Sequence, residues 1–131
     1  MVAEMLHIND ISIFDGRLSY IKPAMLLLNV LVRCKSSDNT VAIYKSDMVQ
    51  AVSDNHRTVA PRTVQWWLER LAKNGAIKFR AERHNVKAPA LIIINPYYIF
   101  DGLSKDYAAV LEHWREFESD VEAVSADYVA V

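Results

Sequence analysis

The spacing of hydrophobic positions changes several times along the chain, and each change predicts a new element. Residues 8–18 alternate isoleucines with polar residues and stop at Asp15-Gly16, which predicts a short strand and a turn. A helix is expected next, with Pro23 at its first position. Its apolar residues recur at helical spacing, namely Leu27, Val30, Leu31 and Cys34. The first third of the chain therefore predicts a strand and a core helix.

Shorter elements are expected between residues 36 and 60. The polar run 36–40 predicts a loop, and the β-like run 41–44 predicts a short strand. A helix should then run from Ser46 to Ser53, with Ser46 as its cap and Asp47 in its first turn. Residues 54–60 are polar and typical of a turn.

A second helix is predicted over residues 61–74, with Pro61 at its first position and Gly75 at a left-handed C-terminal cap. At 100° per residue, one face is apolar and comprises Val64, Trp67, Leu68 and Leu71. Trp66 points away from that face. Because a large aromatic side chain is seldom left fully in water, Trp66 marks either a groove within the chain or an interface, and we favour cover by the wing or a neighbouring helix over contact with a base.

Two strands follow this helix. Residues 76–83 alternate in strand fashion, residues 84–89 form a turn, and residues 90–95 are β-branched and end at Pro96. The order of helix, helix, turn, helix and hairpin predicts an α+β fold, a winged helix-turn-helix with the hairpin as its wing. We place this winged-helix domain, including the N-terminal strand, at residues 1–102.

Residues 103–131 predict a long acidic helix capped by Ser104. Its apolar residues recur every three or four positions, close to a heptad repeat. The proposed dimerisation positions are Tyr107, Val110, Leu111, Trp114, Phe117 and Val121. This face either pairs with a second copy of the chain in a homodimer, which we favour, or folds back onto the winged domain.

Charge is divided unevenly along the 131 residues, although the net charge is only −1. Residues 45–90 hold nine Lys and Arg against four Asp and Glu, whereas residues 91–131 hold two against eight. The basic middle predicts a polyanionic partner, and the acidic end should stay away from it.

Double-stranded DNA is the polyanion that this arrangement fits, because the second helix of a helix-turn-helix enters the major groove. Arg62 and Gln65 have side chains that pair with guanine and adenine edges. The other expected contacts, to phosphates or from the wing, are Arg57, Thr58, Thr63, Arg70, Lys73, Arg80, Arg83 and Lys87.

Two motifs resemble the winged-helix part of the plasmid replication and maintenance proteins called RepL, over about residues 22–102. One is the helix ending L-x-x-x-G-x-I at Leu71, Gly75 and Ile77, which MarR-like repressors share. The other is the closure I-N-P-x-x-I-F-x-G at Ile94, Asn95, Pro96, Ile99, Phe100 and Gly102. The resemblance implies a DNA-binding protein of a plasmid or phage, either a transcriptional regulator or a replication-origin-binding factor.

Other classes of function find little support in the sequence. The four histidines are scattered, the three glycines stand alone, and the single Cys34 lies on the apolar helix face, where a packed thiol is expected. We therefore expect no enzymatic activity, no metal and no cofactor. Without an apolar run long enough for a membrane span, a cytoplasmic protein is expected. The rival function is a winged helix that binds another protein instead of DNA.

Overall fold

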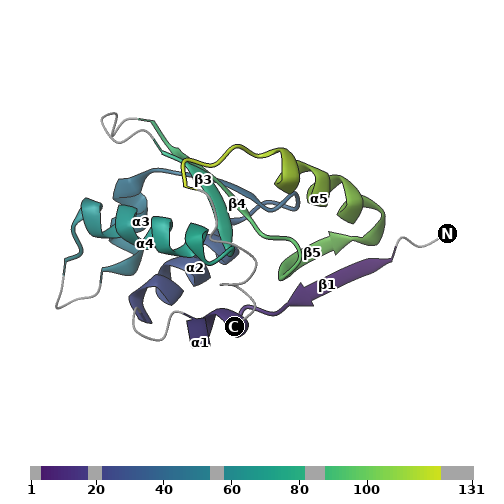
Figure 1. Cartoon of the computed structure of the whole chain (residues 1–131), viewed down its shortest axis with the longest axis horizontal. Helices are drawn as coiled ribbons and strands as arrows, with labels where there is room; N and C mark the ends of the chain where they lie inside the picture. Colours follow the sequence, from purple (N-terminus) through teal and green to yellow (C-terminus); the bar gives the residue numbers. More distant parts are fainter. Residues whose placement is uncertain (1–3, 18–21, 54–57, 82–87, 122–131) are drawn as a thin grey trace.

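Three helices and a three-stranded antiparallel sheet form the centre of the molecule (Figure 1). The computed structural model describes residues 4–17, 22–53, 58–81 and 88–121. The helices are α2 (Lys22–Cys34), α3 (Lys45–Val52) and α4 (Pro61–Lys73). The strands are β2 (Thr40–Ile43), β3 (Ile77–Arg80) and β4 (Ala90–Ile94), in the order β2-β4-β3. The predicted mixed α+β class is confirmed.

Helix α4 has the ends that the sequence predicted. Pro61 is its first residue, where a missing backbone N–H costs nothing. Gly75 follows the C-cap with a φ of 80°, a left-handed conformation that glycine adopts without strain. The N–H of Gly75 donates to the carbonyl of Ala72, and that of Ala76 donates to the carbonyl of Leu71. These two bonds close the helix and turn the chain directly into β3.

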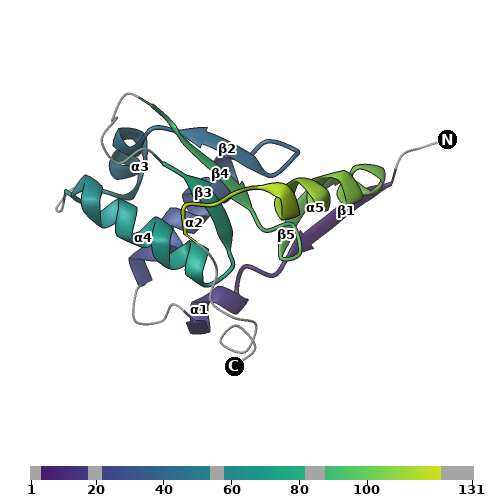
Figure 2. The same ribbon diagram turned by 45° about the horizontal axis from the view of Figure 1, so that its top comes forward.

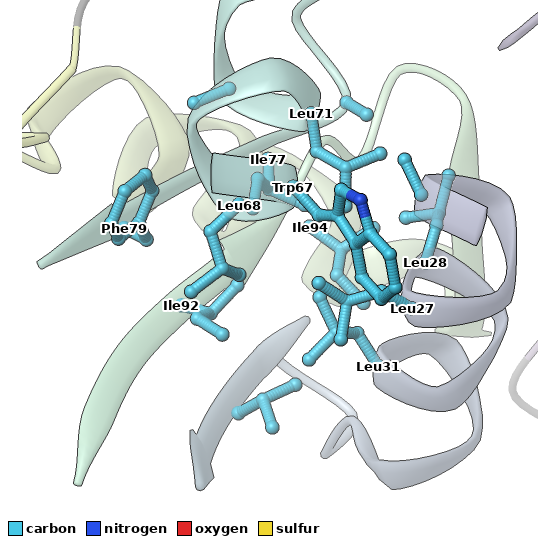
Figure 3. Packing of buried hydrophobic residues seen from close by; sticks show 14 of the residues in the cluster. Leu27, Leu28, Leu31, Trp67, Leu68, Leu71, Ile77, Phe79, Ile92 and Ile94 are labelled. Atoms are coloured by element: carbon cyan, nitrogen blue, oxygen red, sulfur yellow. The ribbon is translucent and has the colours of Figure 1, made fainter. Parts of the chain in front are cut away.

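The core lies between these helices and one face of the sheet. All four residues of the predicted inner face of α4 are buried, with Leu68 and Leu71 fully so and Trp67 only 7% exposed. Figure 3 shows the indole of Trp67 directed toward the leucines of α2. Ile77 and Phe79 of β3 point to the same core. The helical and the strand periodicities therefore converge on one apolar centre.

The end of α5 (Tyr107–Glu116) contacts the opposite face of the sheet through Lys78. Lys78 lies opposite Ile93 in the β3–β4 register, and both alternate with residues that face the main core. The Nζ of Lys78 donates to the carbonyl of Trp114, at 2.6 Å, near the end of α5. Ile93 is fully buried. This face is only partly covered, because Leu91, the other β4 residue that points to it, is 42% exposed.

A separate two-stranded ribbon joins β1 (Met5–Asn9) to β5 (Ile99–Leu103). The strand begins earlier than predicted, and residues 13–17, expected to be a strand and turn, instead form the short helix α1 (Ile13–Arg17). The reason is Phe14, which is fully buried and packs edge-on against Tyr98, with ring centroids 5.2 Å apart. A helical turn places this ring in the core.

Two buried asparagines tie the ribbon and the sheet together. Asn39 has a φ of 66°, and its side-chain amide donates to the carbonyls of Ile94, at 2.9 Å, and Ile99, at 2.6 Å. Asn95 donates from its side chain to the carbonyl of Gly75, at 2.8 Å. Asn39 thus bonds to the last residue of β4 and the first residue of β5, and Asn95 bonds to the turn between α4 and β3, so these carbonyls are satisfied by side chains.

The predicted C-terminal helix is wrong beyond Glu116. Ser104 does not cap this helix: it is the first residue of a 3-10 turn, Ser104–Asp106, and Asp106 is the N-cap of α5. Helix α5 then extends only to Glu116, because Phe117 adopts an extended conformation with ψ of 120°. Figure 2 shows the following residues running back across the molecule to β3. Residues 122–131, also assigned to this helix, lie outside the described residues. The heptad face is therefore not continuous.

Two smaller predictions are also wrong. Ser46 does not cap α3, which begins at Lys45 after the extended residue Tyr44, although Asp47 does lie in its first turn. Cys34 is exposed, because α2 ends at this residue and the buried face stops at Leu31. A packed thiol is thus excluded.

Candidate nucleic-acid interface

The outward face of α4 carries four of the seven predicted DNA-binding residues that the structure describes. Arg62 and Lys73 are exposed near the two ends of the helix, and Thr63 and Arg70 are half-buried beside them. Since the inner face is held in the core, this outward face is rigidly presented to solvent. The structure therefore brings four of the predicted residues onto a single helix surface.

The first turn of α4 contains no acidic residue among those that the structure describes. Ala60 is the N-cap, which has no side chain able to accept a hydrogen bond, and the first turn contains no Asp or Glu. Thr58 is exposed just before this end, whereas Arg57 lies outside the described residues. Backbone N–H groups and the positive helix end favour an anion at such a position.

Gln65 is less accessible than the sequence predicted. Its side chain is half-buried, and its Nε2 donates a long hydrogen bond of 3.4 Å to Oε1 of Glu69, one turn further along. Its Oε1 is buried and accepts no hydrogen bond within the described part of the chain. This oxygen is enclosed by the protein and is therefore not available to a ligand on the helix surface.

Trp66 remains 40% exposed, so the expectation of a ring buried under the wing or another helix is wrong. The guanidinium carbon of Arg70 lies 5.0 Å from the centroid of its ring. This cation–π contact orients Arg70 along the helix surface and keeps the indole close to a positive charge. The two side chains form a combined aromatic and basic patch that the sequence analysis did not identify.

At the wing, only Arg80 of the predicted residues is described, because Arg83 and Lys87 lie outside the described residues. Arg80 is exposed at the end of β3, and its guanidinium carbon lies 4.9 Å from the ring centroid of Phe117. A basic residue of the predicted DNA surface therefore contacts a residue predicted for the dimer interface.

Lys78 contributes to the fold instead of to this surface. Its Nζ lies 4.6 Å from the ring centroid of Trp114 and also donates to that residue's carbonyl. Burial lowers the pKa of Lys78 below its ordinary value. A contact between residues 36 positions apart leaves no signal in local spacing, which is why the sequence did not predict it.

The predicted dimerisation residues mostly contact their own chain. Tyr107 donates from its hydroxyl to the carbonyl of Pro96 and packs against Phe100. Val110 is 5% exposed, Trp114 contacts Lys78, and Val121 packs against the main core. The alternative in which this segment folds back onto the domain therefore describes residues 107–121.

Other kinds of site are not supported within the described ranges. No group of three or more His, Cys, Asp or Glu side chains is placed there to hold a metal ion. None of the helices described is both long and apolar enough to cross a membrane. No protein-family model matches the chain, and no curated protein or solved structure is significantly similar to it.

Proposed function

We propose that this chain binds double-stranded DNA as a winged helix, with α4 in the major groove and the β3–β4 hairpin as the wing. The order α2, β2, α3, α4, β3, β4 and the sheet order β2-β4-β3 fit this architecture. In it, α3 and α4 form the helix-turn-helix, and α4 is the recognition helix.

The observation that carries the proposal is the composition of the outward face of α4. Arg62 is exposed in the first turn, at the end of the helix that enters the groove first. Arg62 suits bidentate bonds to guanine, and Gln65 has the side-chain amide that pairs with adenine. Thr58, Thr63, Lys73 and Arg80 suit phosphate oxygens on either side.

The biological role rests on the resemblance to RepL. It favours a transcriptional regulator or a replication-origin-binding factor of a plasmid or phage. A homodimer would present two recognition helices to a palindromic site. Because residues 107–121 contact their own chain, a dimer would need a surface other than the heptad face. Light scattering of the protein without DNA measures its mass in solution and so tells a monomer from a dimer.

Fluorescence anisotropy with a random duplex and with DNA from the protein's own gene neighbourhood tests the proposal. Affinity should fall linearly with salt on logarithmic axes, because bound cationic side chains release counterions from phosphates. A preference for the native DNA would indicate a specific regulator or initiator. Absence of binding at low salt would contradict DNA binding.

Point variants separate base contacts from phosphate contacts. Arg62→Ala and Gln65→Ala should each reduce discrimination between specific and random duplexes by about 1–3 kcal/mol, whereas Lys73→Ala should weaken both duplexes alike. Lys105→Ala is the matched control, since Lys105 is exposed in the turn before α5 and carries the same charge. If Lys105→Ala and Arg62→Ala lose equal amounts of DNA affinity, the effect of Arg62→Ala is due only to the change in net charge.

The exposed Trp66 supports a second candidate, a module that binds another protein through α4. An aromatic side chain that is 40% exposed beside a stacked Arg70 has the composition of a protein-interface hot spot. Such binding would be far less sensitive to salt than DNA binding. Trp66→Ala would then abolish partner capture while Arg62→Ala has little effect.

A further inference from the structure

One edge of the three-stranded sheet is the outer side of β3, which lies at the end of the strand order β2-β4-β3. An edge strand presents unpaired N–H and C=O groups, which other chain segments or ligands can bind. In this structure the residues Phe117–Val121, called here the arm, occupy that edge (Figure 2).

Four hydrogen bonds attach the arm to β3. The N–H of Asp120 donates to the carbonyl of Phe79, at 2.8 Å, and the N–H of Ala81 donates to Oδ2 of Asp120, also at 2.8 Å. The hydroxyl of Ser119 accepts from the N–H of Phe79, at 3.1 Å, and donates to its carbonyl, at 3.2 Å. Three of the four therefore use arm side chains in place of a regular ladder.

The arm also holds the basic residue of the wing. Arg80 stacks on the ring of Phe117, and Asp120 lines the same open groove as Arg80, together with Ala88, Pro89 and Leu91 at the base of the wing. Arg80 and the Ala81 N–H are the kind of donors that contact a DNA phosphate. A carboxylate of the chain thus stands where the wing would bind an anion.

The hydrogen bonds that hold the arm can be replaced by bonds to another acceptor. Asp120 is exposed, so its hydrogen bond to Ala81 competes with water. Glu118 is exposed beside it and adds a second negative charge close to the wing. Val121, packed against the core, anchors the end of the arm.

We propose that the arm competes with DNA phosphate for Arg80 and the outer edge of β3, so that DNA binding requires its displacement. The proposal rests on the DNA-binding function proposed above. It assigns Arg80 and the Ala81 N–H as a phosphate contact and the Asp120 carboxylate as its internal competitor.

The test measures the affinity of the full chain for a duplex by fluorescence anisotropy in Asp120→Ala and Glu118→Ala. Each variant removes one negative charge from the arm, but only Asp120 bonds to Ala81. Asp120→Ala should bind DNA about three- to tenfold more tightly than Glu118→Ala, because one modest hydrogen bond no longer has to be broken. Equal affinities would overturn the proposal and leave DNA binding intact.

Amide hydrogen exchange of the unmodified protein gives a second, independent result. The Asp120 N–H is bonded to Phe79 in this structure, so its exchange should accelerate when DNA binds. Unchanged or slower exchange in the complex would overturn the competition. If the unmodified chain and both variants all fail to bind DNA even at low salt, the proposed function itself fails, and the competition with it.

Discussion

The side-chain amide of Asn95 donates to the carbonyl of Gly75, which joins the end of the β4 strand to the end of the α4 helix. The backbone N–H of Asn95 donates to the carbonyl of Ala76, and its Oδ1 accepts from the N–H of Tyr97. The I-N-P closure that resembles RepL therefore has a structural role here. It fixes the end of α4 relative to the β3–β4 hairpin.

Replacing Asn95 by Ala should lower the free energy of unfolding by about 1–3 kcal/mol, because a largely buried carbonyl and N–H lose their partners. Urea denaturation measures this loss. Asn29→Ala makes the same substitution at an exposed position of α2 and should change stability little. Equal effects at the two positions would contradict the role of Asn95.

Glycine positions 16 and 75 should respond to alanine in opposite directions. A Cβ at Gly75 meets nothing within 4 Å, but its φ of 80° is strained for alanine, so Gly75→Ala should cost about 1–2 kcal/mol. A Cβ at Gly16, inside α1, also meets nothing within 4 Å. Gly16→Ala should therefore raise the free energy of unfolding by about 0.5–1 kcal/mol. Thermal unfolding of the two variants compares them directly.

The adjacent residues Trp66 and Trp67 should differ in their effect on stability, because one is on the surface and the other is in the core. Trp67→Ala removes a side chain that is 7% exposed and should cost about 3–5 kcal/mol. Trp66→Ala removes one that is 40% exposed and stacked on Arg70, and should cost at most about 1 kcal/mol. Chemical denaturation measures the loss of stability in each variant. Similar losses would show that both rings lie in the core.

Asp38 should make stability depend on acid pH. Burial alone would raise its pKa, but hydrogen bonds from Ser36 and Thr40 outweigh burial and hold the pKa below its ordinary value. The charged form is therefore favoured by folding, and this stability is present above the unfolded pKa of about 3.9 and lost as pH falls through the lower folded pKa.

Asp38→Asn isolates that charge, because the amide oxygen still accepts these bonds. At pH 7 the variant should be less stable by less than about 1 kcal/mol, since the carboxylate is exposed to water. The difference should disappear near pH 2. Urea denaturation at both pH values measures it, and a difference that persists in acid would show that the charge is not responsible.

Local patterns were reliable where each element is specified by its own residues. Pro61, the apolar face of α4 and Gly75 define a helix without reference to the rest of the chain, and the hairpin strands follow from their alternation and from Pro96. Correspondingly, most described residues expected on the outward face of α4 are at least partly exposed there.

The errors arose where distant contacts decide the structure. Residues 117–121 have helical spacing, but Ser119 and Asp120 bond to the edge of β3, about 40 residues earlier in the chain. Serine and aspartate are unfavourable in the interior of a helix, because their side chains bond readily to backbone groups. The tertiary contact with β3 therefore prevailed over the helical periodicity. The inward turn of Phe14 likewise depends on Tyr98, which no local pattern reveals.

The β1–β5 ribbon constrains the order in which the chain can fold. Met5 pairs with Leu103 and Asn9 with Ile99, so β1 has no ladder partner until residues 99–103 have been synthesised. Closing so long a loop is slow compared with forming the α4 helix or the β3–β4 hairpin. During synthesis β1 therefore stays unpaired until β5 is made. We expect the ribbon to form after the β3–β4 hairpin.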